Sequence, residues 1–579
     1  MTLCAPRAGA TAPVAAGVAA HLLDLVGDPV TATVGWDIDW QGPLSVPLAD
    51  ERAVQAACGI MHVHGRAAGR PAPLAVDYAS TVAGVLAAQG VCAALLARAG
   101  GADVTHVRTS VGQAALLALT QYLAAATADG DDQEGCLTSR ADAGDELVPA
   151  ALPFVSADGV RFELEALDAD RWLDFWRLLG ADRADTGRGW RSFQQRFATA
   201  TCSLPRALPA AARRAPFTTI RSAADRSGAA VLPVREDPVP PTVTSPWTLT
   251  PFPGPGGTTI GRARTSTDGA PLTGLRVVES ARRVQGPLAG HVLRLLGADV
   301  VRVEPPGGDP MRGIPPMAGT TSARFSALNA GKAVTEIDFT TDAGRRAVRE
   351  LVSEADVFLH NWAPGKAARL GLDAEDLRPT RPGLVYAWAS GWGDALGPEP
   401  PVGTDYLVQA HSGLAAAVRP ADEPPAPSLM TLTDVLGGLV CAQGVLAALL
   451  ARLRTGRGGR VDSSLHSAAA LVPRGPGRPA ATDRPLRTRD GYIALGSRAR
   501  ERPELLARAL GLGASASADT IASRARTRPT EDWLPRLAAA GVAATPVCTS
   551  LADLARDPRF APSLTVGEYA APRAPWEFS

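Results

Sequence analysis

A sequence pattern that occurs twice constrains this chain more than any other feature. Residues 88–98 read AQGVCAALLAR and residues 442–452 read AQGVLAALLAR. The same offset aligns Val107 with Val461 and Ser110 with Ser464, and further along GAAVLPV at 228–234 parallels GVAATPV at 541–547. A repeat of this length predicts a duplicated structural module. The pattern indicates a module that is whole in the C-terminal part and truncated at its front in the N-terminal part.

A segment crowded with Pro, Gly, Ser and Thr separates the two parts. Residues 238–271 show neither helical nor strand periodicity, which is typical of a linker. A chain of 579 residues also exceeds what one hydrophobic core can hold. We therefore expect residues 1–237 to form a truncated copy and residues 272–579 a complete module, made of a sheet-forming half (272–403) and a small domain with a C-terminal return (404–579).

The front of the C-terminal part alternates apolar runs with helical spacing. Apolar runs at 275–278 and 300–303 flank a helical pattern at 287–296 that starts with Pro and is followed by Gly297. A second round follows, with a helix at 343–353 and strands at 357–359 and 384–388. The fold class is thus α/β, a doubly wound parallel Rossmann-like sheet plus a smaller α/β domain, with the ligand crevice at the carboxyl ends of the strands. The turn after the first run carries no GxGxxG pattern, so a dinucleotide site is not predicted.

Composition excludes several classes of partner. The formal net charge is +0, so no global field favours nucleic acid or an anionic membrane. The seven cysteines form no CxxC pair, which fits a reducing compartment and argues against disulfides and a structural metal site. The first twenty residues lack a compact apolar core, and we find no later stretch of about 20 continuously apolar residues. We expect a cytoplasmic protein without a membrane or nucleic-acid partner.

A series of motifs in one order is the most specific signal in the chain. The motifs are PLTGLRVVES (271–280), LGADVVRVEPPGGDPMR (296–312), LNAGKAVTEIDFTTDAGR (328–345), ADVFLHNWAPGKAARLGL (355–372), LVYAWASGWG (384–393), DYLVQAHSG (405–413), TDVLGG (433–438) and RLRTGRGGRVDSSL (452–465). In this order they resemble the family III CoA-transferases, the group of formyl-CoA and carnitine CoA-transferases that also contains the α-methylacyl-CoA racemases. The resemblance implies the CoA-transferase fold, with a degenerate second copy at the N-terminus.

The resemblance implies Asp434 as the catalytic nucleophile. In the family this aspartate forms a mixed anhydride with the acyl group and then an aspartyl-CoA thioester, so coenzyme A is a substrate and no cofactor is permanently bound. Locally, Asp434 directly precedes a helix-forming run at 435–453. A carboxylate at a helix start is favoured in its ionised form, which can attack a thioester. The alternative is a plain helix cap.

The resemblance also implies residues that contact CoA. They are Val284, Gln285, Ile337, Asn361, Trp362 and Arg369. Family positions that are commonly basic carry Pro305, Thr340 and Val402 here, so the phosphates must find other partners among Arg302, Arg312, Lys332 and Lys366, or these four are solvated surface charges. Asp405 is expected to support the active site, or else is a surface carboxylate in a turn. Gly475 and Gly477 are a poor substitute for the glycine-rich lid of some members, and the presence of a lid stays open.

Two other functions are weighed against the transferase. The racemase branch carries a histidine before the DYxxxQ-like segment, where this chain has Thr404, so two-base proton exchange lacks a partner. His411 falls within a turn. A catalytically degenerate CoA-binding protein is the other alternative.

The N-terminal copy is expected to be a silent, structural half. The repeat offset carries Asp434 onto Ser80, with Asp77 three residues earlier, and no βαβ front precedes them. Because members of the family are typically dimers of interlocked chains, the tandem chain is expected to form an intrachain pseudo-dimer. A further homodimer stays open.

Overall fold

The computed structural model describes most of the chain. The described residues are 12–27, 33–128, 147–149, 152–254, 270–475, 477–478, 484–496, 499 and 501–579.

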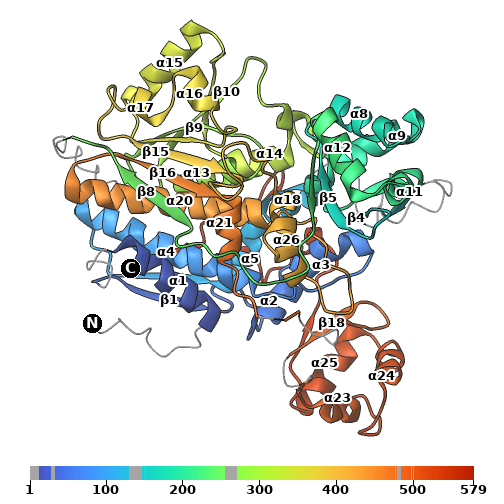
Figure 1. The fold of residues 1–579 in the computed structure, drawn as a ribbon. Coiled ribbons are helices and arrows are strands. Elements are labelled where there is room, and N and C mark those ends of the chain that lie inside the picture. Colours follow the sequence, from blue (N-terminus) through green and yellow to red (C-terminus); the bar gives the residue numbers. More distant parts are fainter. Residues whose placement is uncertain are drawn as a thin grey trace.

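A mixed sheet in the C-terminal part organises the fold (Figure 1). Its strands are β8 (Trp247–Pro251), β9 (Arg276–Ser280), β10 (Asp299–Glu304), β13 (Ala333–Glu336), β14 (Val357–His360), β15 (Val385–Ser390) and β16 (Gly459–Ser464). They lie in the order β13-β10-β9-β14-β15-β16-β8, and all neighbours are parallel except β8, which runs antiparallel to β16. Counted from β9, the parallel strands follow the order 3-2-1-4-5-6 of a doubly wound sheet. The predicted α/β fold class is confirmed.

Helices cover both faces of this sheet, which explains its continuous apolar strands. Helix α13 (Gln285–Leu295) lies on one face and α15 (Asp342–Ser353) on the other (Figure 1). Successive side chains of a strand point to opposite faces. Accordingly Val277 packs into the core that holds α13, and Val278 into a second core.

The sequence repeat forms two long helices that lie side by side at the centre, α4 (Tyr78–Ala99) and α20 (Leu432–Thr455) (Figure 1). The side-chain amide of Gln89 donates to the carbonyl oxygen of Leu439 at 2.8 Å, and that of Gln443, its repeat partner, faces the sulfur of Cys92 at 3.3 Å. Both helices are long and apolar enough by mean hydropathy to cross a membrane, although polar residues such as Gln89 and Gln443 interrupt them. However, 100% and 89% of their apolar windows are buried inside the protein, as in core helices.

Each part has a small domain built on an antiparallel sheet. In the N-terminal part it contains β4 (Phe154–Val155), β5 (Arg161–Glu165), β7 (Ala230–Pro233), α8 (Ala169–Leu178) and α12 (Phe217–Ser227). In the C-terminal part it contains β17 (Leu486–Arg487), β18 (Tyr492–Leu495), β19 (Ala544–Pro546), α23 (Pro503–Ala509) and α25 (Thr530–Ala539).

Each small domain packs against the other part. Arg235 donates its backbone N–H to Ala410 in α18 (Asp405–His411) at 2.9 Å, and Cys548 donates to Ala56 in α2 (Glu51–Ala57) at 2.9 Å. Ala410 and Ala56 are related by the repeat offset. The two contacts are therefore reciprocal.

The terminal strands are exchanged in the same reciprocal way. Strand β8 lies inside the predicted linker yet completes the C-terminal part's sheet, where Trp247 lies against Gly444. Strand β22 (Glu577–Phe578) pairs with β2 (His106–Ser110) of the N-terminal part, where Trp576 lies against Gly90. Residues 255–269, also in the predicted linker, lie outside the described residues.

The N-terminal part keeps only the end of the sheet. Among its described residues, β1 (Gly35–Asp39) and β2 correspond to β15 and β16, and no strands correspond to β9, β10, β13 and β14. Helix α1 (Pro13–Val26) packs on α4 as α13 packs on α20. The described residues of the N-terminal part thus hold counterparts of β15 and β16 alone from the parallel part of the sheet.

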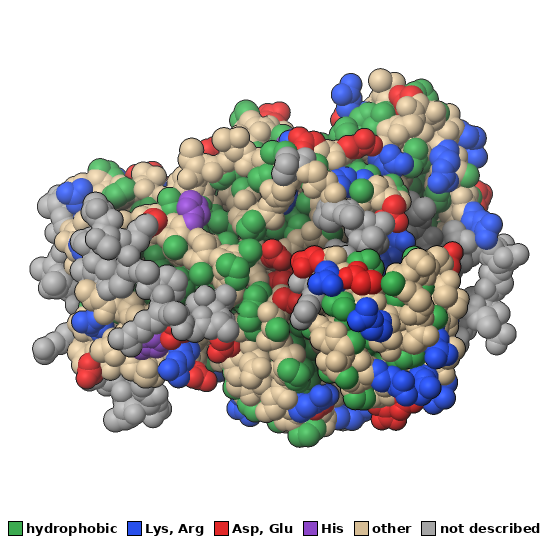
Figure 2. Space-filling model, turned by 90° about the horizontal axis from the view of Figure 1, so that it is seen from below, with side chains coloured by type: hydrophobic (Ala, Val, Ile, Leu, Met, Phe, Trp, Pro, Cys, Tyr) green, Lys and Arg blue, Asp and Glu red, His purple; other side chains and the backbone are tan. Residues whose placement is uncertain are grey.

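Acidic and basic side chains are interspersed on the face drawn in Figure 2. This distribution accords with the zero net charge, and no broad field of one sign covers that face.

Candidate active site

Asp434 lies in the first turn of α20, but a neighbouring carboxylate caps the helix. The helix begins at Leu432, and Asp434 is partly exposed. The backbone N–H groups of Thr433 and Asp434 donate to the Oδ1 atom of Asp405, at 2.6 and 3.0 Å. The cap predicted for Asp434 is therefore supplied by Asp405 from α18.

Asp405 is buried and well supplied with donors. It is 4% exposed and also accepts hydrogen bonds from the Thr433 hydroxyl, at 2.7 Å, and from the Gln409 side-chain amide. Burial raises the pKa of Asp405 to about 6, although these hydrogen bonds oppose the rise.

The pKa of Asp434 is raised well above its usual range. Burial is the main cause, and the negative charge of Asp405 adds to it, whereas the Arg283 guanidinium lowers the pKa and Glu165 raises it. The sequence predicted the opposite, an ionised form stabilised by the helix start. The difference arises because burial and the charge of Asp405 raise the pKa, while Asp405 accepts the N–H groups of Thr433 and Asp434.

Close helix packing places Gln285 beside the second turn of α20. A Cβ added at Gly438 would lie 2.6 Å from the backbone oxygen of Gln285, and one added at Gly437 would lie 3.0 Å from its side-chain amide. Only glycine allows α13 and α20 to approach so closely. The Gln285 amide donates to the carbonyl oxygen of Ser390 at 3.1 Å, at the end of β15.

A cavity of about 610 Å³ joins these elements at the carboxyl ends of β9, β14 and β15. Five of the sequence-predicted residues line it, namely Asp434, Asp405, Gln285, Asn361 and Trp362. It opens where the strand order reverses between β9 and β14, the expected ligand crevice of a doubly wound sheet.

The other three predicted CoA contacts do not line this cavity. They are Val284, Ile337 and Arg369. Val284 is 1% exposed and packs in the core, so its side chain has no route to a ligand. Ile337 packs against the second core, next to Phe339 in the cavity wall. Arg369 lies in α16 (Lys366–Leu370), whose first residue does line the cavity.

Asn361 shapes the switch point of the sheet. Its side-chain oxygen accepts from the backbone N–H of Arg282 at 3.0 Å, and its amide donates to the Arg282 carbonyl at 2.9 Å. The turn after β14 thus holds the turn after β9.

An aromatic wall with a cation adjoins this switch point. The rings of Trp362 and Phe339 lie 5.3 Å apart, and the Lys366 ammonium lies 5.6 and 5.3 Å from their centroids. Burial and the charges of Arg282 and Arg369 lower the pKa of Lys366. This end of the cavity offers a stacking surface and positive charge.

Three of the four proposed phosphate ligands are already paired. Arg302 is 1% exposed and bonded to Glu279, to Glu304 and to Asp309. Lys332 pairs with Glu279 at 2.8 Å, and Arg312 pairs with Glu304 at 2.8 Å. These three cations hold the turns of the sheet together. Arg302 and Lys366 line the cavity, and Lys366 takes no part in these ion pairs.

The N-terminal part supplies a wall of the cavity, which the sequence did not predict. Glu165, Leu167, Arg171 and Phe197 line it. Glu165 is held by Arg196 at 3.1 Å, and Arg196 lies 4.7 Å over the Tyr406 ring of α18. Charged residues scattered through 160–200 carry no sequence pattern that marks this contact.

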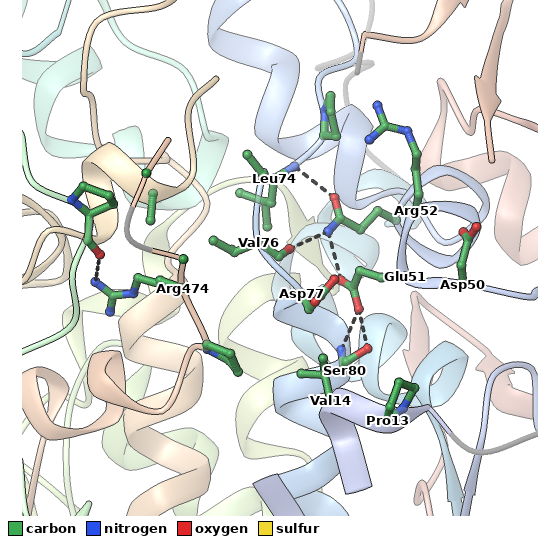
Figure 3. A pocket seen from close by; sticks show the side chains of 18 of the residues that line it. Pro13, Val14, Asp50, Glu51, Arg52, Leu74, Val76, Asp77, Ser80 and Arg474 are labelled. Carbon is green, nitrogen blue, oxygen red and sulfur yellow. Dashed lines mark hydrogen bonds between the residues drawn. The ribbon is translucent and has the colours of Figure 1, made fainter. Parts of the chain in front are cut away.

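A counterpart of the site exists in the N-terminal part, without an equivalent of Asp434 (Figure 3). Glu51 accepts from the backbone N–H groups of Ala79 and Ser80 and from the Ser80 hydroxyl, at 2.9, 2.8 and 2.7 Å. Gln55 donates to Glu51 at 2.9 Å, as Gln409 donates to Asp405. The capping arrangement is retained, whereas Ser80 occupies the place of Asp434.

The short glycine-rich segment lies at this counterpart. Gly475 and Gly477 line a cavity of about 480 Å³ together with Glu51 and Ser80. They do not line the cavity of Asp434. Among the described residues the segment is therefore not a lid over the nucleophile.

Comparisons with known proteins match two segments of the chain, one in each part. The model of the family "CoA-transferase family III" matches residues 35–238 and 272–578. The succinyl-CoA:glutarate CoA-transferase of Mus musculus is 35% identical over 214 residues, which are 36% of this chain and 49% of that protein. The acetyl-CoA:oxalate CoA-transferase of Acetobacter aceti is 36% identical over 197 residues, 34% of this chain and 51% of that protein.

A solved structure, a CAIB/BAIF family protein from Brucella suis, covers 54% of this chain and 93% of its own at 31% identity, with a TM-score of 0.48. The chain spans about half the length of the curated relatives it matches. With two matched segments that together span most of its length, the chain belongs to CoA-transferase family III.

Proposed function

We propose that the protein is a CoA-transferase that moves coenzyme A between carboxylic acids, with Asp434 as the covalent nucleophile. One observation carries the proposal. A partly exposed aspartate at a helix start faces the ligand crevice of a doubly wound sheet. The names of the relatives include glutarate and oxalate. This supports carboxylic acids as the substrate class.

The reaction needs no net proton transfer. The ionised carboxylate of Asp434 attacks the thioester carbonyl, the C–S bond breaks, and CoA leaves as a thiolate. The thiolate attacks the aspartyl carbonyl of the mixed anhydride, which releases the first acid and stores CoA as an aspartyl thioester. An acceptor carboxylate then reverses these two steps with its own acyl group.

The chain's own residues are proposed to bind and position the substrate. Gln285 packs against Gly437 and Gly438 and lines the same cavity as Asp434, and Trp362 offers its ring near Lys366. Asn361 is proposed to position the turn as well as to face the ligand. Three predicted CoA contacts remain. Ile337 and Arg369 are proposed to contact CoA at the edge of the site, and Val284 is proposed to contact CoA through its backbone alone.

Initial-rate kinetics test the transferase directly. With a panel of acyl-CoA donors and carboxylic acids, a double-displacement reaction gives parallel lines in double-reciprocal plots, because the donor acid leaves before the acceptor binds. Intersecting lines, or no CoA transfer with any pair, would contradict the proposal.

The racemase alternative is less well supported by the site. No histidine is among the described residues that line the cavity, and Thr404 stands there instead. His411 packs its ring against Trp392 at 5.5 Å. In deuterated water the protein should leave the α-proton of a branched acyl-CoA unexchanged; rapid deuterium incorporation without an acceptor acid would favour the racemase.

We also propose how the two parts of the chain are organised. The reciprocal contacts support an intrachain pseudo-dimer in which residues 1–237 complete the site of residues 272–579. A cytoplasmic location, without a membrane or nucleic-acid partner, is part of the proposal.

A further inference from the structure

Five cations line the cavity of Asp434, namely Arg171, Arg282, Arg283, Arg302 and Lys366. For four of them, an ion pair or a position in the cavity accounts for the charge. Arg302 is buried in ion pairs, and Arg171 pairs with Asp168 at 3.2 Å. Arg282 and Lys366 lie at the aromatic end. Arg283 is left.

Arg283 lines the same cavity as Asp434. Its guanidinium lies 5.8 Å from the centroid of Phe197, on the wall that the N-terminal part contributes. Its charge lowers the pKa of Asp434, yet the two groups form no ion pair, so they are near each other and not in contact. It forms no ion pair with any other described carboxylate. The backbone of the adjacent Arg282 bonds to Asn361, and the charge of its side chain lowers the pKa of Lys366, so the two arginines influence different groups.

The backbone at Arg283 is strained. Its φ is +64°, and among the described residues other than glycine only Ala200 shares a positive φ. Such a conformation costs roughly 1 kcal/mol or more and persists where the surroundings impose it, often at functional sites. Here it lies in the turn from β9 into α13, two residues before Gln285.

The chemistry of the site requires a cation at this place. An incoming carboxylate is an anion. When it arrives, Asp434 is an uncharged aspartyl thioester, but the wall also holds Asp405 and Glu165. Glu165 is paired with Arg196. Asp405 is buried among hydrogen-bond donors but still opposes ionisation of Asp434. Without a cation near Asp434, no group would balance the charge of the incoming carboxylate beside these acidic side chains.

We propose that Arg283 binds the carboxylate of the acceptor acid and holds it against the aspartyl carbonyl of Asp434. This inference rests on the proposed function. One carboxylate oxygen pairs with the guanidinium, and the other attacks the aspartyl thioester. The C–S bond breaks, and the thiolate that leaves then attacks the acyl carbonyl of the new anhydride. The C–O bond to the aspartyl oxygen breaks with its electron pair, which restores the Asp434 carboxylate and yields the new acyl-CoA.

The test separates the two half-reactions. Arg283→Asn removes the cation and suits a positive φ, so the turn is retained. Loss of a charged hydrogen bond should lower kcat/KM for the acceptor roughly tenfold or more. Formation of the Asp434 adduct from acyl-CoA alone should change less than about twofold. Both are measured at a pH where Asp434 is ionised, so that its pKa does not enter.

Two further measurements distinguish binding from a structural effect. An alkylsulfonate, an anion that cannot form the anhydride, should compete with the acceptor in the native protein and lose roughly tenfold in affinity in Arg283→Asn. Arg283→Lys should restore part of that affinity. Arg282→Gln, the matched control, should instead raise KM for acyl-CoA and leave the acceptor's kcat/KM unchanged.

Each outcome has one meaning. If the native protein forms the Asp434 adduct and Arg283→Asn keeps the native kcat/KM for the acceptor, the role of Arg283 is refuted. If the native protein forms no adduct on Asp434, the proposed function itself is refuted, and the role of Arg283 falls with it.

Discussion

Two aspartates meet at the first turn of α20 and have different roles. Asp434 belongs to that turn, and Asp405 reaches it from α18. Asp405 takes the backbone N–H groups of the turn, so it acts as the cap, while Asp434 remains available to the cavity. Because the cap comes from α18, replacement of Asp434 should not disturb the helix.

Asp434→Asn should therefore fold normally and lose transfer activity. Asn is isosteric but cannot attack a thioester, so turnover should fall by several orders of magnitude. Circular dichroism serves as the folding control and CoA transfer as the readout. Near-native turnover in this variant would refute the mechanism.

Asp405→Asn should shift the pH profile. Asp434 must be ionised to attack, so kcat/KM for acyl-CoA rises with pH through its raised pKa. The negative charge of Asp405 contributes to that raised pKa. Its removal should lower the pKa of Asp434 and move the rising limb to lower pH.

Glu51→Gln, the matched change at the counterpart site, controls for this shift. Glu51 caps α4 as Asp405 caps α20, but no nucleophile stands beside it. The rising limb should stay in place. A shift to higher pH in Asp405→Asn, or an equal shift in Glu51→Gln, would contradict the assignment.

At the scale of helices and strands, the exchanged terminal strands hold the two parts together. Trp247 and Trp576 are 5% and 6% exposed and lie against Gly444 and Gly90. Trp576 also donates its indole N–H to the Leu86 carbonyl at 2.7 Å.

Trp576→Ala should lower the free energy of unfolding by about 3–5 kcal/mol, the usual cost of removing a buried tryptophan. Val566→Ala, at a side chain that is 66% exposed, should cost no more than about 0.5 kcal/mol. Chemical denaturation measures both. An unchanged midpoint for Trp576→Ala would show that β22 is not part of the N-terminal core.

The helices and parallel strands could be predicted because burial imposes a clear pattern on them. The helix predicted at 287–296 is α13 (Gln285–Leu295), and the strand at 357–359 is β14. Strand β8 was missed because Pro and Thr surround it and it lies at a sheet edge.

The site could be predicted only where a motif marks it. Asp434 and Asn361 stand in motifs and line the cavity. Asp405 was placed beside the site, but its capping bonds depend on how α18 meets α20. Arg283 and Glu165 are recognised only once distant segments are brought together, since single charged residues carry no periodicity.

On the scale of the whole molecule, the N-terminal part is proposed to complete the site without catalysis of its own. Its counterpart of Asp434 is Ser80, and its described residues lack the strands that form the crevice. It nevertheless supplies Glu165 and Phe197 to the working cavity.

Ser80→Ala and Asp77→Asn should each leave turnover within about twofold of the native value, since neither lies in the working cavity. Steady-state kinetics decide this. Loss of activity in Asp77→Asn would refute the silent-partner hypothesis.

Removal of residues 1–240 should expose the apolar face of α20 that packs on α4. Each Å² of apolar area uncovered costs roughly 25 cal/mol, so aggregation or forced homodimerisation should follow. Light scattering is the measurement. A truncated protein that stays monomeric and fully active would refute the structural role.

The central claim is tested most directly by mass spectrometry of the intact protein after incubation with a panel of acyl-CoA thioesters. The account predicts an acyl or CoA adduct on the peptide that carries Asp434, absent in Asp434→Asn. CoA transfer without an adduct on that peptide, or with an adduct on another residue, would contradict it.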